Sequence, residues 1–377
     1  MGRSSFLAFS LLAGPAAAAL LAACSGNGAI RPPVSDNQSD DPCDPGGGSV
    51  TTGPSLAVDA GAAPLPLPGG SGGIGFDDLR FSSTLSMLLV PAGRTGDLDL
   101  VDPSSESISP VSGFSTAATY SGDDTFGVTS ADEGNATVYA VDRTSMKLAV
   151  VDPKAKTILS QVMLAATPGY VRYVAPTHEV WVTEPSQQQI EVFTLGATAS
   201  TPPAHAATIA VMGGAESLEI AVPTTALDAG GRAYAYTHTP TTTVAIDVAA
   251  RSVATTWSNG CATAMGIAVD STNGWVVSAC AEGMLVVQTN QGATIGTVNV
   301  GAGVDQIAYD PQTLRLYAPG PASSTMSIVR LAANGAPTLL GSVQTPKDSH
   351  CAVTNGGGSV YVCAPSAGAV LFIQDPF

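Results

Sequence analysis

A 16-residue pattern that recurs seven times is the feature that most limits what this chain can fold into. Its clearest copy, residues 137–152, reads TVYAVDRTSMKLAVVD: an apolar stretch, a short polar turn and a second apolar stretch. The copies begin at residues 87, 137, 179, 232, 274, 315 and 359, so successive starts lie 50, 42, 53, 42, 41 and 44 residues apart. A period of roughly 40–50 residues, with several short strands in each repeat, is typical of a β-propeller.

Each repeat contains enough strand-like segments for a four-stranded antiparallel blade. An inner strand is expected before each pattern, at residues 76–81, 125–130, 170–175, 218–222, 265–270, 306–310 and 351–354. Outer strands are expected at residues 157–163, 206–211, 252–257, 294–300 and 337–343. No segment shows a sustained helical period. The sequence therefore predicts an all-β, seven-bladed β-propeller over residues 55–377.

The seventh repeat needs a strand from elsewhere in the chain. The sequence ends at Phe377, directly after the third strand of this repeat, which would leave apolar residues 370–373 at a sheet edge. Soluble proteins avoid such edges because they pair with other chains. We expect an N-terminal strand to close the last blade. Residues 56–60 are the best candidate, since residues 61–75 could then return from the rim to the axis.

The N-terminus reads as an export signal over residues 1–23. Arg3 precedes a largely apolar run at residues 6–23, and Leu21-Ala22-Ala23-Cys24 matches a bacterial lipobox, in which cleavage precedes a lipidated cysteine. An ordinary cleaved signal and an uncleaved anchor helix are the alternatives. Ser25 after Cys24 resembles the sorting signal of outer-membrane lipoproteins in enteric bacteria. We expect a lipid-anchored protein of the bacterial cell envelope, at the outer membrane, with Cys24 as the lipidated residue.

Composition and charge predict a linker after Cys24 and limit the possible partners. Residues 24–54 are rich in Gly, Pro, Ser and Asp, which predicts a flexible tether between lipid and propeller. The predicted mature chain lacks Arg3 and has 13 basic against 30 acidic residues, a net charge of −17. Such a chain repels phosphate backbones, so nucleic acid is not expected as a partner. A monomer is expected, because a propeller closes on itself.

The repeats resemble a known family. Val180-Trp181-Val182-Thr183-Glu184 and Val360-Tyr361-Val362-Cys363 look like the YVTN motif of bacterial and archaeal surface propellers. Val150-Val151-Asp152 and the residues up to Ile158 resemble the segment that follows this motif in the family. The Asn of YVTN is absent from all seven copies. The resemblance implies a seven-bladed fold and leaves function open, because related propellers serve as adhesins, binding modules and enzymes.

Four of the six cysteines lie in predicted hairpins. Cys261 and Cys280 belong to the fifth repeat, and Cys351 and Cys363 occupy similar places in the seventh. A register that pairs Val353 with Tyr361 brings the second pair face to face, so both pairs are predicted as cross-strand disulfides. A metal or redox site would require closer spacing such as CxxC. Cys43 in the predicted tether is free, paired between molecules or simply unpaired.

A ligand-binding face is expected where inner strands begin and second strands end. This rule selects acidic, basic and imidazole side chains, which suit a polar ligand or a divalent cation. The candidates are Asp142, Arg143, Arg172, Glu184, Glu219, His238, Asp305 and His350. The alternative is that these residues are polar only because the rim of a propeller is solvated.

Catalysis has little support in the sequence. The chain has four histidines, and His238 and His350 come from repeats on roughly opposite sides of the ring, so a three-histidine metal centre is hard to assemble. No metal site is predicted, and Ca²⁺ is the one cofactor considered. We therefore expect a non-catalytic binding module for an envelope protein or glycan. The alternative is an envelope enzyme of the lactonase or dehydrogenase-propeller type, with Ca²⁺ held by Glu184, Glu219 and Asp305.

Overall fold

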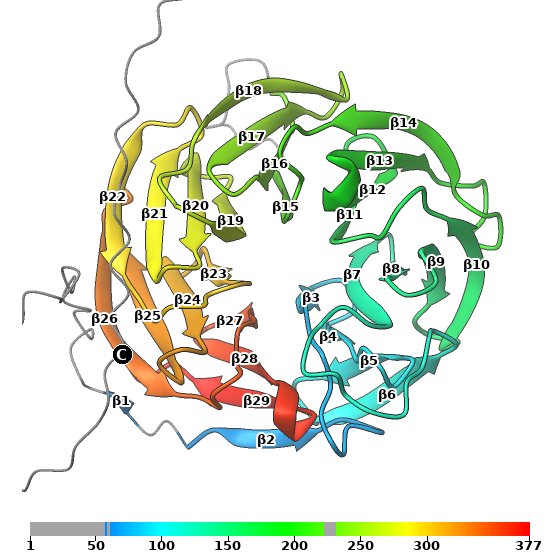
Figure 1. Cartoon of the computed structure of the whole chain (residues 1–377), viewed down its shortest axis with the longest axis horizontal. Helices are drawn as coiled ribbons and strands as arrows, with labels where there is room; N and C mark the ends of the chain where they lie inside the picture. Colours follow the sequence, from blue (N-terminus) through cyan, green and yellow to red (C-terminus); the bar gives the residue numbers. More distant parts are fainter. Residues whose placement is uncertain (1–56, 59–60, 222–230) are drawn as a thin grey trace, which may run out of the picture. The chain divides into compact units, whose positions relative to one another are not determined.

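The computed structural model describes residues 57–58, 61–221 and 231–377, which form seven sheets arranged as a ring (Figure 1). Six sheets have four strands and one has five; antiparallel pairing builds each blade. The prediction of an all-β, seven-bladed propeller is confirmed. The predicted signal, tether, Cys24 and Cys43 lie outside the described residues. No helix in the described part of the chain is long and apolar enough to cross a membrane.

Blades one to seven follow the chain, and each runs from an inner strand at the axis to an outer strand at the rim. Blade one contains β3 (Arg80–Ser82), β4 (Met87–Pro91), β5 (Asp97–Asp102) and β6 (Ser107–Ser112). Blade two contains β7 (Val128–Gly134), β8 (Thr137–Asp142), β9 (Lys147–Asp152) and β10 (Thr157–Met163). Blade three contains β11 (Val171–Val174), β12 (Glu179–Glu184), β13 (Gln189–Thr194) and β14 (Ala204–Ala210). Blade four contains β15 (Leu218–Ala221), β16 (Tyr234–His238), β17 (Thr242–Asp247) and β18 (Ser252–Ser258). Blade five contains β19 (Ala264–Asp270), β20 (Trp275–Cys280), β21 (Met284–Thr289) and β22 (Thr294–Asn299). Blade six contains β23 (Ala308–Asp310), β24 (Arg315–Gly320), β25 (Thr325–Leu331) and β26 (Pro337–Gln344), and blade seven contains β27 (Ala352–Gly356), β28 (Ser359–Ala364) and β29 (Ala369–Gln374).

The repeated pattern forms the second and third strands of each blade. In blade two it becomes β8 and β9, whose central residues are buried on both faces because neighbouring blades cover them. The aspartate that ends the pattern shapes the next turn: Asp152 accepts hydrogen bonds from the backbone N–H groups of Lys154 and Ala155, each at 2.9 Å. Such Asx turns reverse the chain within a few residues. This local chemistry explains why the pattern is readable in the sequence.

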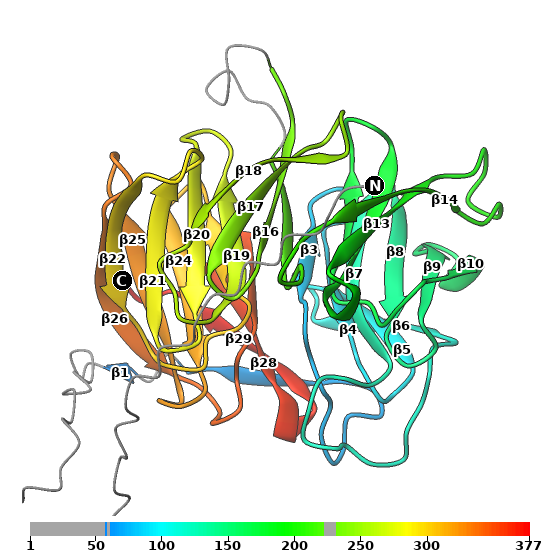
Figure 2. The ribbon, with the colours of Figure 1, turned by 45° about the horizontal axis from the view of Figure 1, so that its top comes forward.

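An N-terminal strand closes blade seven, as expected, but the predicted segment was wrong. The closing strand is β2 (Ala63–Pro66), which pairs antiparallel with β29; the two lie side by side in Figure 1, and in Figure 2 β2 is the blue strand that follows β1. Residues 57–58 instead form β1 (Ala57–Val58), which pairs parallel with β26 of blade six. Pro64 and Pro66 lower the strand propensity of β2, yet proline is tolerated in an edge strand because one row of N–H groups needs no partner. The closure buries Val370 and Ile373.

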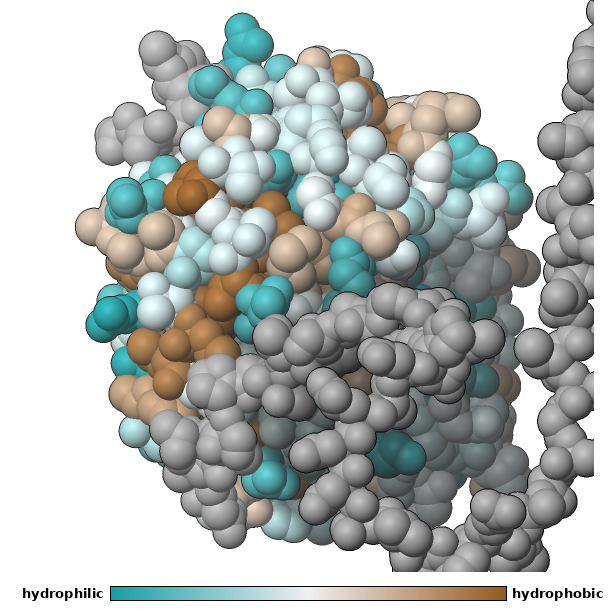
Figure 3. All heavy atoms as spheres, turned by 60° about the vertical axis from the view of Figure 1, so that its left-hand side comes forward, coloured by the Kyte–Doolittle hydropathy of each residue, from teal (hydrophilic) through white to brown (hydrophobic). Residues whose placement is uncertain are grey.

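The core lies between the blades rather than at one centre. Apolar side chains of adjacent sheets form separate clusters, such as the one that joins Trp181 and Ile190 of blade three to Ala235 and Ile246 of blade four. Figure 3 views the side that carries β22 and β26 and shows hydrophobic residues among hydrophilic and intermediate ones. Because the apolar side chains pack between neighbouring blades, the side chains at the axis can be polar.

Candidate functional site

The segment between β2 and β3 carries two acidic side chains, Asp77 and Asp78, to the axis. It is rich in glycine because it passes close to other backbone. A Cβ atom on Gly75 would lie 2.2 Å from the carbonyl oxygen of Asp123, and one on Gly70 would lie 2.4 Å from that of Gly368. Only glycine permits such approaches.

Asp78 is the centre of a buried polar cluster that we call the axial plug, formed by Asp78, Arg172 and Gln306. Nη1 and Nη2 of Arg172 donate to the two carboxylate oxygens of Asp78 at 2.6 and 3.0 Å. Gln306 Nε2 donates to Oδ1 at 2.7 Å, and Ser130 Oγ donates to Oδ2 at 2.6 Å. The plug therefore joins the entry to blade one with blades three and six across the ring, and Ser130 links it to blade two.

A second layer of charge lies beside the plug. Glu219 Oε1 accepts from Arg80 Nη1 at 2.6 Å and from Arg172 Nη2 at 3.2 Å, and Asp132 lies 3.5 Å from Arg80 Nε. Burial lowers the pKa of the Arg172 guanidinium, but Asp78 and Glu219 more than offset this and raise it above its ordinary value. Arg172 is therefore a permanent buried cation that its neighbours neutralise.

The starts of the inner strands surround an acidic depression that we call the axial mouth. Its volume is about 470 Å³, and its polar lining consists of Tyr120, Asp123, Asp124, Asp305, Asp348 and His350. Arg143 lies nearby; its Nη2 donates to Asp77 at 2.6 Å, and its Nη1 lies 3.8 Å from Asp124. Acidic groups thus outnumber cations at this end of the axis.

The hydrogen bonds of His350 define its charge. Nδ1 lies 2.8 Å from the carbonyl oxygen of Asp348, and Nε2 lies 2.9 Å from that of Phe76. Carbonyl oxygens only accept, so this geometry favours the ring with protons on both nitrogens. Burial lowers the pKa of His350, but Asp305 reverses this and raises it overall. Burial raises the pKa of Asp305 to about 7, with His350 opposing.

Asp142 and Glu184 have structural roles that the sequence prediction did not foresee. Each stands at the end of its blade's second strand and holds the loop arriving from the previous blade. Asp142 accepts from the N–H of Ser115 at 2.8 Å, and Glu184 accepts from the N–H of Ala166 at 2.8 Å. Both are buried. Asp142 and Glu184 occupy the same position in their copies of the repeated pattern, and this shared position could have indicated that both hold a loop.

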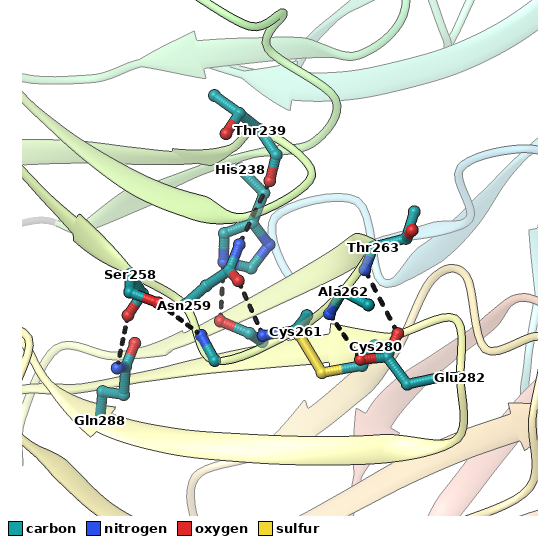
Figure 4. Close-up of a disulfide and its surroundings, with 12 residues drawn as sticks. His238, Thr239, Ser258, Asn259, Cys261, Ala262, Thr263, Cys280, Glu282 and Gln288 are labelled. Atoms are coloured by element: carbon teal, nitrogen blue, oxygen red, sulfur yellow. Dashed lines mark hydrogen bonds between the residues drawn. A yellow bond between two sulfur atoms is a disulfide. The ribbon is translucent and has the colours of Figure 1, made fainter. Parts of the chain in front are cut away.

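His238 is sealed inside the protein beside a disulfide. It has no exposed surface, and its Nε2 lies 2.9 Å from Ser278 Oγ. Burial lowers its pKa to about 3, so the ring is neutral. Figure 4 shows it beside Cys261 and Cys280, which form the first predicted disulfide with Cα atoms 5.2 Å apart. A buried Ser–His pair cannot meet a substrate.

The second predicted disulfide also forms. Cys351 and Cys363 are joined, with Cα atoms 5.5 Å apart, and Val353 pairs with Tyr361 in the predicted register. The bond fixes β28 to the segment that leads into β27, directly after His350. It therefore stabilises one wall of the axial mouth.

The structure separates the residues that the Ca²⁺ hypothesis requires. Glu184 holds a loop between blades, Glu219 lies beside the plug, and only Asp305 lies at the axial mouth. In the described part of the chain, Asp124, Asp305 and His350 have ligand atoms within 4.8 Å of one another. Both ring nitrogens of His350 already contact carbonyl oxygens, so Asp124 and Asp305 are the remaining ligands of this group. Their two carboxylates supply at most four of the six to eight oxygens that Ca²⁺ takes.

The predicted face therefore divides into three groups. Arg143, Asp305 and His350 lie at the axial mouth; Arg172 and Glu219 lie at or beside the plug; and Asp142, Glu184 and His238 are buried within or between blades. Sequence reasoning missed Asp77, Asp78 and Asp124 as axial groups. The rule that selected residues near the starts of the other inner strands also applied to Asp77 and Asp78, because they lie at the start of the inner strand predicted at residues 76–81.

Comparison with known proteins supports the fold alone. Neither a family model nor a curated protein sequence matches the chain. A solved structure of hydrazine synthase from Kuenenia stuttgartiensis is similar, with a TM-score of 0.62 at 12% identity, over 81% of this chain and 96% of that one. A chain of a mitotic checkpoint complex gives a TM-score of 0.63 at 13% identity, over 83% and 94% of the two chains.

Two further propellers resemble the chain to the same degree. The propeller domain of Cps50 (Swd1) from Myceliophteria thermophila gives a TM-score of 0.63 at 10% identity, over 81% of this chain and 97% of that one. The structure of U3-55K gives 0.64 at 10% identity, over 83% and 98%. At such identities the shared property is the seven-bladed β-propeller architecture.

Proposed function

We propose that this protein is a lipid-anchored propeller of the bacterial cell envelope that binds a partner and catalyses no reaction. One observation supports the non-catalytic part: His350, His238 and Glu184, three of the candidate catalytic groups, already hold the fold. His350 donates to two carbonyls, His238 has no exposed surface, and Glu184 accepts the N–H of Ala166. General acid–base catalysis needs a titrating group within reach of substrate, and these arrangements leave none of them free.

The axial mouth is the binding surface that we favour, and a basic segment of an envelope protein is the partner. Asp123, Asp124, Asp305 and Asp348 line the mouth, while Arg143 and His350 are engaged by acidic or carbonyl partners. Arginine and lysine side chains would be attracted by the remaining negative charge. The mitotic checkpoint complex, by its title, places a similar propeller in a protein assembly, which supports partner binding as a use of this fold.

The test is affinity capture from solubilised envelopes with the full chain and two charge-reversal variants. Asp124→Lys changes the mouth, whereas Glu106→Lys makes the same change at an exposed turn in blade one. We expect a partner that is lost with Asp124→Lys, kept with Glu106→Lys and weakened by salt. Equal capture by both variants would refute the mouth as the binding surface. One Ca²⁺ per chain, together with substrate turnover, would instead favour the lactonase-like alternative.

A further inference from the structure

A second pocket occupies the central channel on the other side of the axial plug. Its volume is about 310 Å³, and its lining includes Arg80, Arg172, Ser217, Glu219 and Gln306. The chain direction shows that the two pockets are separate. In blades five, six and seven, Met265, Asp305 and His350 line the axial mouth and lie at or just before the starts of β19, β23 and β27. The channel pocket is lined by residues farther along these strands.

Two buried polar atoms of this pocket lack a partner. Ser217 is 2% exposed and its Oγ makes no hydrogen bond, and Arg172 is 1% exposed with its Nε unpartnered. Both residues line the pocket. Each of these atoms has less than 1 Å² of exposed surface, so a ligand reaches the Ser217 hydroxyl through a change of its side-chain rotamer. A buried donor without a partner costs about 1–3 kcal/mol, and a ligand that bonds to it recovers this free energy. The missing hydrogen bonds of these atoms do not depend on the shape of the pocket.

The remainder of the lining is uncharged and offers both donors and acceptors. It comes largely from β19, β23 and β27, each of which is the terminal strand of its described sheet, so one edge has no partner strand. Such edges present backbone N–H and C=O groups alternately. Phe81, Tyr170 and Tyr309 add aromatic surface to the same pocket.

The charges of the pocket oppose an ionic ligand. Arg172 is paired with Asp78 and Glu219, and Arg80 is paired with Glu219 and lies near Asp132. An anion would have to displace Glu219 or Asp78, and a cation would have to displace an arginine; either change leaves a buried charge unpaired. A hydroxyl group both donates and accepts, so it can satisfy Ser217, the Nε of Arg172 and strand edges without breaking an ion pair.

We propose that the channel pocket binds a small neutral polyhydroxylated molecule, with the chemistry of one or two sugar rings. The volume lies at the lower end of the roughly 300–1,000 Å³ of small-molecule sites. The ligand is either a free sugar or the terminal residue of a glycan. This site lies apart from the axial mouth, so it stands independently of the partner proposed there.

The experiment measures binding to the purified full chain by saturation-transfer NMR and calorimetry. The probes are glucose, galactose, N-acetylglucosamine and maltose, each up to 20 mM, with acetate and butylamine as ionic controls. Ser217→Ala removes the unpartnered hydroxyl. Ser349→Ala is the matched control, since Ser349 is also fully buried with an unpartnered Oγ but does not line this pocket.

We expect at least one sugar to bind, with affinity reduced about fivefold or more by Ser217→Ala and unchanged by Ser349→Ala. This fold-change corresponds to about 1 kcal/mol, the net contribution of one hydrogen bond. A reducing-end-blocked oligosaccharide that binds as well as the free sugar would identify a glycan terminus as the source. Absence of binding by every sugar, equal effects of the two variants, or preferential binding of acetate or butylamine would overturn the proposal.

Discussion

Arg172 of blade three and Asp78 of the segment entering blade one form a two-point ion pair at the propeller axis, with N–O distances of 2.6 and 3.0 Å. Asp78 is fully buried and Arg172 is 1% exposed. The pair is the central contact of the axial plug, and it separates the axial mouth from the channel pocket. Its loss would affect both ends of the axis.

Breaking this pair should strongly destabilise the fold. Arg172→Met leaves the Asp78 carboxylate buried without its cation, and removal of one partner of a buried pair costs about 3–5 kcal/mol. Urea unfolding of Arg172→Met should show a loss of this size. Arg232→Ala removes a 65% exposed arginine that lies 3.8 Å from Asp247, so it should cost less than about 1 kcal/mol. Similar losses in the two variants would contradict the assignment.

The closing strand should be required for a stable monomer. A chain that lacks residues 1–60 keeps β2. A chain that lacks residues 1–66 loses β2, which exposes the edge of β29 and removes Leu65 from the apolar cluster that it packs against. Full burial of a leucine contributes about 1.5–3 kcal/mol, and Leu65 is partly buried, so it contributes a fraction of this; an open apolar edge also promotes association. We expect the shorter chain to unfold earlier in urea and to aggregate during size-exclusion chromatography. Indistinguishable behaviour of the two truncations would show that β2 is dispensable.

Both disulfides should contribute to stability. Their cysteines are 19 and 12 residues apart, and cross-links over loops of this length contribute about 3 kcal/mol in the chain-entropy model. Replacing Cys351 and Cys363 with serine together should lower the free energy of unfolding by this amount, and dithiothreitol should then lower it further through Cys261–Cys280. Free thiols at these four positions in the oxidised protein, detected by alkylation and mass spectrometry, would exclude the pairing.

Asp99 should make stability depend on pH. It is fully buried in β5, neither carboxylate oxygen has a partner, and burial, with a smaller effect of Asp97, raises its pKa to about 7. A folded-state pKa above the unfolded value of about 3.9 favours folding at low pH, and this advantage is lost as pH rises from about 4 through 7. Stability at pH 8 should therefore increase in Asp99→Asn.

The size of this effect follows from linkage, since each pKa unit corresponds to about 1.4 kcal/mol. Asp99→Asn should therefore gain about 2–4 kcal/mol between pH 4 and pH 8 relative to the unmodified chain. Glu106→Gln, which removes an exposed carboxylate, should leave the pH profile nearly unchanged. Parallel profiles for the unmodified chain and Asp99→Asn would disprove the buried-carboxyl explanation.

Local chemistry determined the blades from the sequence. Short apolar stretches, turn-forming aspartates such as Asp152, and cysteines in neighbouring strands act within about 20 residues, so their effects can be predicted from local sequence. The number of blades, the register of Val353 with Tyr361 and both disulfides followed from such patterns. The need for a closing strand also followed, because the last repeat lacked its fourth member.

The tertiary structure alone decided which residues meet at the axis. Asp78 is 94 residues from Arg172 and 228 from Gln306, and no local pattern encodes contacts over such separations. It also decided that the proline-containing β2, rather than residues 56–60, closes the ring, because an edge strand needs only half of its N–H groups. The sequence determined the blades through local propensity, whereas ring closure determined the plug, the mouth and the channel by bringing distant inner strands together.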